Sequence, residues 1–321
     1  MERRNFLKGA ALAAGSMAMM PSMLSASMTK PAKGEKIPSG AVTLYFEFRI
    51  MEQFKDDMLA KVNAYAKALH GKKGFLSLQL KNMVGDSTMV HNYPTKLKGV
   101  LSSAYFDASK EGSMPLFYSL FIRFENYHDL MASNTTKWFA KVISKYGMLS
   151  KNYHEGVYKT VAAGDREHIY TSQEQITKFL KNQKDKTTNR YITVNNHVGI
   201  FTKDTAVFNK KSTSLLKVAQ NTFRPAKGDY DYNPKFPVGI PGSYQNMHYR
   251  KAISTEILQS AFSDGNNKTH YLFHGVWESV YDHENSHTDP RFRADVMKIF
   301  PYIVEGPVEP FYETIILDNN A

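Results

Sequence analysis

The sequence contains no cysteine. Disulfide bonds, thiolate nucleophiles, iron–sulfur clusters and cysteine-ligated zinc or haem are therefore excluded. Glycine-rich phosphate loops, G-x-S-x-G elbows and HExxH motifs are also missing, so NTPase, α/β-hydrolase and zincin assignments have no support. A fold without disulfides depends on its apolar core, and 321 residues are enough for two domains of ordinary size.

Long apolar runs are also scarce. Gly9–Met20 is apolar but shorter than the ~20 residues that a membrane-spanning helix needs. It follows the twin-arginine motif ERRNFLK (Glu2–Lys8) and precedes the small residues Ser25–Ser27. We therefore expect residues 1–28 to be a removable signal peptide, residues 29–40 to be a linker, and the chain to be periplasmic without a stable membrane span. A retained anchor helix is the alternative.

This signal also implies a partner, the twin-arginine export machinery. That route carries proteins already folded, often because a cofactor was loaded beforehand, and so favours a bound cofactor without proving one. Lysine and arginine number 41 and aspartate and glutamate 30, giving a formal net charge of +11. Residues 1–27 hold three basic residues and one acidic residue, so removing them leaves about +9. The lysines are scattered and no nucleic-acid signature accompanies them, so we interpret the charge as solvated surface and expect no nucleic-acid partner.

A strand–turn–helix unit occurs twice, which is the clearest architectural signal in the chain. The clearer copy lies within Lys268–Ile316, and a looser one covers Pro115–Tyr146. Alternating and helical periods extend each copy to the order βαββαβ, the split ferredoxin-like unit. In the first copy we expect strands at 41–49, 75–80, 116–124 and 154–161, and helices at 54–70 and 127–146. In the second we expect strands at 191–201, 242–253, 270–277 and 310–317, and helices at 205–222 and 289–300.

These elements predict an α+β chain with a first ferredoxin-like domain at 41–165 and a second at 191–321. Residues 166–190 form the linker between them, with a short amphipathic helix at 173–182.

Several short segments resemble a known family. They are Gly74–Leu80, Phe121–Tyr127, Trp138–Phe139, Gly242–Tyr244, Gly275–Ser279, His287 and Arg291–Phe292. Over residues 41–162 and 191–317 the chain resembles the antibiotic-biosynthesis-monooxygenase-like group of dimeric α/β barrels. The resemblance implies two ferredoxin-like sheets that face each other around a pocket. In a tandem chain the two units would close this barrel within one molecule.

The wider superfamily includes cofactor-free quinone-type monooxygenases, haem-degrading monooxygenases, chlorite-dismutase-like proteins and dye-decolourising peroxidases. The GxxDG signature of the peroxidases is absent. The resemblance therefore implies an exported oxidoreductase or monooxygenase-like protein that acts with haem or on an aromatic or quinone-like small molecule. The alternative is a non-catalytic periplasmic accessory protein that binds haem or a small ligand. Whether the chain is an enzyme, and whether it forms a homo-oligomer, stays open.

Histidines of the second copy are the main site candidates. His197, His274 and His248 fall on its first, third and second expected strands, which are neighbours in the ferredoxin-like order 4-1-3-2. Neighbouring strands lie about 4.8 Å apart, so three histidines on one face could converge on a haem iron or a divalent metal. We expect His197 and Asn195 to face the barrel interior. The alternative is that each histidine lies on a different face, because register cannot be read from sequence.

The predicted catalytic residues are thus His197, His274, Asn195 and Trp277, and the predicted cofactor ligands are His248, His197 and His274. The haem-degrading group also resembles the chain through a first-strand Asn (Asn195 or Asn196), Trp277 and His283 or His287.

His283 and His287, spaced i, i+4, could share a helix face, but their polar neighbours favour a turn and an N-cap before Pro290. Arg123 and Glu125 could bind an anionic group, but we expect them to form an ordinary ion pair at the sheet rim. Trp138 is expected to fill a core.

Overall fold

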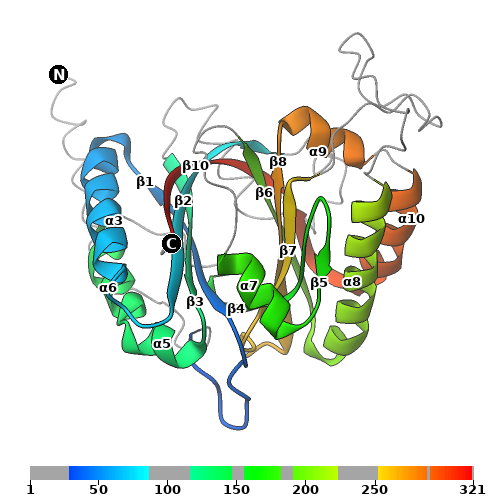
Figure 1. Cartoon of the computed structure of the whole chain (residues 1–321), viewed down its shortest axis with the longest axis horizontal. Helices are drawn as coiled ribbons and strands as arrows, with labels where there is room; N and C mark the ends of the chain where they lie inside the picture. The colour runs from blue at the N-terminus through cyan, green and yellow to red at the C-terminus, as the bar shows by residue number, and fades with distance from the viewer. Residues whose placement is uncertain are drawn as a thin grey trace, which may run out of the picture.

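In the computed structural model, the described residues are 29–86, 116–146, 155–181, 191–222, 252–287 and 290–319. Eight antiparallel strands form a closed barrel, with helices on two opposite sides (Figure 1). The first half contains β1 (Val42–Ile50), α3 (Lys55–Leu69), β2 (Phe75–Asp86), β3 (Leu116–Phe124), α5 (Tyr127–Ala132), α6 (Thr135–Val142) and β4 (Gly156–Asp165). A short strand, β5 (Ile169–Tyr170), and α7 (Gln173–Lys181) connect the halves.

The second half repeats the unit. It contains β6 (Ile192–Phe201), α8 (Thr205–Thr222), β7 (Ser254–Ser260), β8 (Lys268–Trp277), α9 (Val280–Ser286), α10 (Pro290–Ile299), β9 (Ile303–Val308) and β10 (Pro310–Asn319). Short 3-10 helices are η1 (Glu52–Phe54), η4 (Ile143–Tyr146), η5 (Thr202–Asp204) and η7 (Phe300–Tyr302). No helix within the described residues is long and apolar enough to cross a membrane.

Strand pairing explains the closure. Each half has the order 4-1-3-2, seen as β4-β1-β3-β2 and β10-β6-β8-β7. The second strand of each half then pairs with the fourth strand of the other, as β2 with β10 and β4 with β7. Every strand of the barrel thereby gains two neighbours and no edge remains to be protected. The predicted fold class, two ferredoxin-like units in one intrachain barrel, is confirmed.

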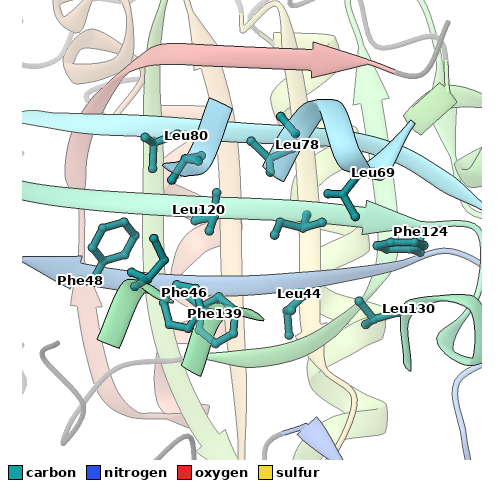
Figure 2. Close-up of a cluster of buried hydrophobic side chains, with 14 of the residues drawn as sticks. Leu44, Phe46, Phe48, Leu69, Leu78, Leu80, Leu120, Phe124, Leu130 and Phe139 are labelled. Atoms are coloured by element: carbon teal, nitrogen blue, oxygen red, sulfur yellow. The ribbon is translucent and has the colours of Figure 1, made fainter. Parts of the chain in front are cut away.

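Alternation along the strands sends residues to two different environments. In β1, Leu44, Phe46 and Phe48 pack under the helices of the first half, whereas Tyr45 and Glu47 lie on the barrel side. Figure 2 shows the helix-facing layer, where the ring of Phe46 stacks on that of Phe139 at 3.6 Å between centroids. Aromatic and branched side chains fill the space between this half's sheet and helices.

Three sequence expectations need correction. The single helix expected at 127–146 divides into α5 and α6, because Asn134 adopts a left-handed φ of 60° between them. The strand expected at 242–253 falls mostly outside the described residues, and the strand that pairs at this place is β7, Ser254–Ser260. The histidine-containing turn is the helix α9.

Candidate functional site

The barrel interior contains a buried network of polar and charged side chains. The Glu47 carboxylate accepts hydrogen bonds from Tyr45, from Tyr312 (3.1 Å) and from His197 Nε2 (2.7 Å). Asn195 Nδ2 donates to the Tyr45 hydroxyl at 3.2 Å. Tyr45 comes from the first half and His197 from the second, so this network joins the two sheets. Burial, followed by the charge of Glu47, raises the pKa of Tyr45 well above its ordinary value, and the phenol stays protonated.

A second buried group also joins the halves. Arg123 Nη2 of β3 lies 2.8 Å from Glu256 Oε1 of β7, with both side chains fully buried. His274 Nδ1 lies 3.5 Å from the same carboxylate oxygen. Burial lowers the pKa of His274 to about 4 against the opposing effect of Glu256, so its ring is neutral near pH 7. Lys81 of β2 donates to Thr193 and Thr314.

Haem is the cofactor that the resemblance implies for His197 and His274. Both rings lie inside the barrel, but their surroundings are packed by the fully buried cluster of Tyr45, Phe121, Tyr158, Leu258 and Leu272. The Phe121 ring centroid lies 4.9 Å from that of His274. A planar macrocycle would have to displace several of these rings. The described residues of the barrel interior therefore do not fit a haem group, and we interpret the network as structural.

A cavity of about 160 Å³ lies on the other side of the second-half sheet, between β6, β7 and β8 and the helices α8, α9 and α10. Its walls are mainly apolar side chains, including Val198 and Phe273 on the helix-facing side of the sheet and Leu215, Leu216 and Phe292 on the helices. The polar residues of its lining are Asn196, Ser212, Thr255, Glu256, His274, His283, Ser286, His287 and Glu309. Among these, His283, His287 and Glu309 converge and form what we call the polar end of the cavity. An apolar chamber with a few convergent polar groups is the usual form of a small-molecule site.

Trp277 forms part of this cavity wall and is almost fully buried. Gly275 lets its indole lie against the strand, because a Cβ at Gly275 would lie only 2.8 Å from Trp277 Nε1. Across the cavity rim, the Trp277 and His283 rings meet edge to face at 5.3 Å between centroids. The pocket wall thus contains an indole ring in direct contact with an imidazole ring.

Helix α9 places the histidines. Ser279 begins it as an N-cap, since its hydroxyl accepts from the Asp282 amide (3.2 Å) and donates to the Asp282 carboxylate (2.6 Å). One turn of helix then brings His283 and His287 together, with their Nε2 atoms 3.2 Å apart. Burial, and then the neighbouring His287, lowers the pKa of His283 well below its ordinary value, so this imidazole is neutral.

Glu309 completes the polar end. It follows β9, whose approach to β6 depends on Gly306: this residue has a φ of 81°, and a Cβ there would clash with the backbone oxygen of His197. Glu309 is 2% exposed, accepts a hydrogen bond from Asn196 and lies 3.7 Å from His287 Nε2. Asn196 therefore orients the carboxylate toward the histidine pair.

The predicted site residues fall into two places. His197, Asn195 and His274 meet inside the barrel, where Asn195 and His274 are direct register partners. Trp277 is three residues from His274 on an unbroken strand, so it faces the opposite side and lines the helix-side cavity. His248 lies outside the described residues. The register position opposite His274 on the second strand belongs to Glu256.

Sequence reasoning missed several site residues. Glu47, Glu256 and Glu309 carry no local motif, and their roles depend on strand register. Arg123 is not a rim residue, because it is fully buried and pairs with Glu256, while Glu125 pairs with Lys181 outside the barrel. The i, i+4 spacing of His283 and His287 was the one available signal for the polar end of the cavity.

These features define a tandem ferredoxin-like barrel with a helix-side pocket in its second half. Residues 41–129 match the family model of the ABM-like domain, and residues 161–315 match that of the CT0912-like, C-terminal domain. No curated protein gives a significant match. The ABM-like match supports the superfamily that the sequence motifs indicated.

Several solved structures are similar to this chain at low sequence identity. A proposed monooxygenase from Fusobacterium nucleatum has a TM-score of 0.51 and 9% identity, covering 88% of this chain and 95% of its own. An anthrone oxidase-like protein has a TM-score of 0.48 and 10% identity, covering 88% and 94%. A proposed monooxygenase from Lactobacillus acidophilus has a TM-score of 0.46 and 7% identity, covering 88% and 98%. The similarity to the Fusobacterium protein shows a shared fold.

Proposed function

We propose that the chain is an oxidoreductase of the monooxygenase-like kind that acts directly on an aromatic or quinone-like small molecule bound in the helix-side cavity. The cavity itself carries the proposal. Its volume of about 160 Å³ is close to that of apolar cavities of ~150 Å³ that accept benzene. A single aromatic ring fits this space, whereas the four-pyrrole ring of haem is several times larger.

The cavity would bind such a ring by two kinds of contact. Trp277 and Phe292 offer aromatic faces and edges, which favour offset or edge-to-face packing with a second ring. A hydroxyl or carbonyl on the ring would meet the polar end, where Glu309 and His287 can accept or donate a proton. We expect quinols and phenols to bind more tightly than unsubstituted aromatics for this reason.

Tryptophan fluorescence offers a direct test. The chain has two tryptophans, and Trp138 stacks on Tyr65 in the first half at 3.8 Å, far from the cavity in sequence and fold. The variant Trp138→Phe would leave Trp277 as the single reporter. We expect saturable quenching by a naphthoquinol or hydroquinone, with one site per chain. Trp277→Phe in place of Trp138→Phe is the matched control and should show no such quenching.

Turnover separates an enzyme from a binding protein. We expect oxygen consumption that depends on the quinol and saturates at the concentrations that quench Trp277. Binding without oxygen consumption would favour the alternative, a small-ligand-binding accessory protein. Absence of both would overturn the proposal.

A visible spectrum tests haem separately. We expect added haem to keep the broad Soret absorption of free haem, without the sharpened and shifted band of a protein-bound haem. A band that disappears in His197→Ala or His274→Ala would show that the barrel interior opens to admit haem.

We also propose that this reaction takes place in the periplasm after twin-arginine export. The motif at Glu2–Lys8 supports this proposal. Replacing both Arg3 and Arg4 with Lys should retain the chain in the cytoplasm, as followed by cell fractionation. Unchanged export of that variant would contradict the assignment.

A further inference from the structure

Three side chains with metal-ligating atoms converge at the polar end of the helix-side cavity. One ligand atom from each of His283, His287 and Glu309 lies within 4.8 Å of the others. The two imidazole Nε2 atoms are 3.2 Å apart, and His287 Nε2 is 3.7 Å from Glu309 Oε2. Ligands bound to one ion at roughly 2.0–2.2 Å lie about 3–3.5 Å from each other. Two of the three separations are therefore close to those around a bound ion, and the third, at most 4.8 Å, would shorten on binding.

The ligand types agree with a particular class of metal. Two histidines and one carboxylate hold Zn(II) in several hydrolytic enzymes and form the facial triad of non-haem Fe(II) oxygenases. Such sites keep coordination positions free for water or substrate. All three side chains line the cavity, so the remaining positions of an ion would face the space where a small molecule fits.

Neighbouring residues hold the three candidate ligands in position, as a metal site requires. Asn196 donates to Glu309, which fixes one carboxylate oxygen and leaves the other toward His287. Hydrogen bonds of this kind around a metal orient its direct ligands. Trp277 and Phe311 each pack against His283 at 5.3 Å between ring centroids, which restrains the imidazole.

We propose that His283, His287 and Glu309 bind one divalent transition-metal ion, Fe(II) or Zn(II), at the wall of the helix-side cavity. The competing explanation is a metal-free cluster in which a protonated His287 forms an ion pair with Glu309. The inference concerns the same cavity as the proposed function but does not require that an aromatic molecule binds there.

Titration of the metal-free full chain tests the proposal. After chelator treatment, Co(II) and Zn(II) are added without any organic ligand. We expect one ion per chain by calorimetry and a visible absorption band for bound Co(II). In the Trp138→Phe variant, Co(II) should also quench Trp277, because that ring contacts His283. No uptake of either ion by the wild-type chain would overturn the proposal.

Variants identify the ligands. Glu309→Gln keeps the size of the side chain and the acceptor for Asn196, and we expect it to weaken binding more than 100-fold. His283→Ala and His287→Ala should do the same. Asn196→Ala should weaken binding roughly 10–100-fold, as expected for a residue that orients a ligand. His168→Ala, at an exposed histidine between β4 and β5, is the control and should bind like wild type.

Circular dichroism distinguishes a folding defect from the loss of a metal ligand. Circular dichroism of Glu309→Gln should match wild type. A folded Glu309→Gln protein that binds Co(II) with wild-type affinity and spectrum would overturn the assignment. Metal analysis of the chain purified without added metal then distinguishes Fe from Zn. Metal uptake without quinol binding would uphold this inference while the proposed function fails, and quinol binding by a chain that takes up neither Co(II) nor Zn(II) would do the reverse.

Discussion

The two halves share one fold but use the layer between sheet and helices differently. In the first half this layer is filled by rings such as Phe46, Phe48 and Phe139 (Figure 2). In the second half the corresponding layer, under α8, α9 and α10, contains the cavity of about 160 Å³. With two copies of the unit in one chain, the first copy has a fully packed core, and the second contains a cavity that can serve as a binding site. An unfilled cavity costs stability, so the filled copy offsets the hollow one.

Inside the barrel the two halves cannot be compared separately, because side chains from both pack against each other. Arg123 of the first half and Glu256 of the second are fully buried partners. Arg123→Met would leave the Glu256 carboxylate without this cation, and we expect a loss of roughly 3–5 kcal/mol in the free energy of unfolding. Urea denaturation measures it.

The double variant Arg123→Met with Glu256→Met removes both charges. It should recover most of the lost stability, because two apolar side chains of similar size can replace a buried ion pair. A single variant within about 1 kcal/mol of wild type would show that water reaches Glu256 and that the interior is less closed than the geometry indicates.

A matched pair of enlarging substitutions tests the filled and hollow layers directly. Leu120 is fully buried in the first-half core and Leu216 lines the cavity. Leu120→Phe should overpack its layer and destabilise the chain by about 1–3 kcal/mol. Leu216→Phe should be near neutral by thermal denaturation and should abolish the quenching of Trp277 by quinols. Equal destabilisation by both would mean that the second layer is as tightly packed as the first.

The elements that could be predicted from sequence are those with one apolar face and one polar face. Alternation placed β3 at 116–124 and helical period placed α8 at 205–222, both as observed, because one face of each packs against apolar side chains. The strand β7 was missed because its barrel-side residue Glu256 and its helix-side residue Gln259, which accepts a hydrogen bond from Asn209 of α8, are both buried polar residues. A polar barrel interior removes the contrast between an apolar inside and a polar outside on which strand prediction depends.

The candidate site was harder to predict than the fold. Parity along an unbroken strand already separates His274 from Trp277, but only the structure shows which side holds a cavity. Glu309 reaches the histidine pair through the pairing of β9 with β6, a contact between distant segments. Local sequence has no signal for it, whereas the i, i+4 histidines follow from helix geometry alone.

The pH dependence of the free energy of unfolding provides a further test of the barrel interior. Burial, and then the charge of Glu47, raises the pKa of Glu155 from 4.5 to about 8. The folded state then binds a proton that the unfolded state has released, so stability should fall as pH rises from about 4.5 to about 8. The slope cannot exceed about 1.4 kcal/mol per pH unit for one proton.

The interval from pH 7 to 8 is the most informative, because it lies above both the folded pKa of His274, about 4, and its ordinary value of 6.5, so His274 contributes little to the slope there. Denaturation midpoints in urea should decrease across this interval in the wild type and stay nearly level in Glu155→Gln. An equal decrease in both would assign the effect to another group.

The smallest expected effect comes from Glu125, two residues beyond Arg123. It lies just past the end of β3, where Lys181 Nζ of α7 lies 2.5 Å from its Oε1, and both side chains are partly exposed, Glu125 at 40% and Lys181 at 49%. Glu125→Gln should change the free energy of unfolding by only about 0–1 kcal/mol, and less in high salt, because water screens exposed pairs. A loss as large as that of Arg123→Met would mean that α7 is a main stabiliser of the barrel. The contrast between these two neighbours would isolate burial as the cause, since both carry a full charge and an ion-pair partner.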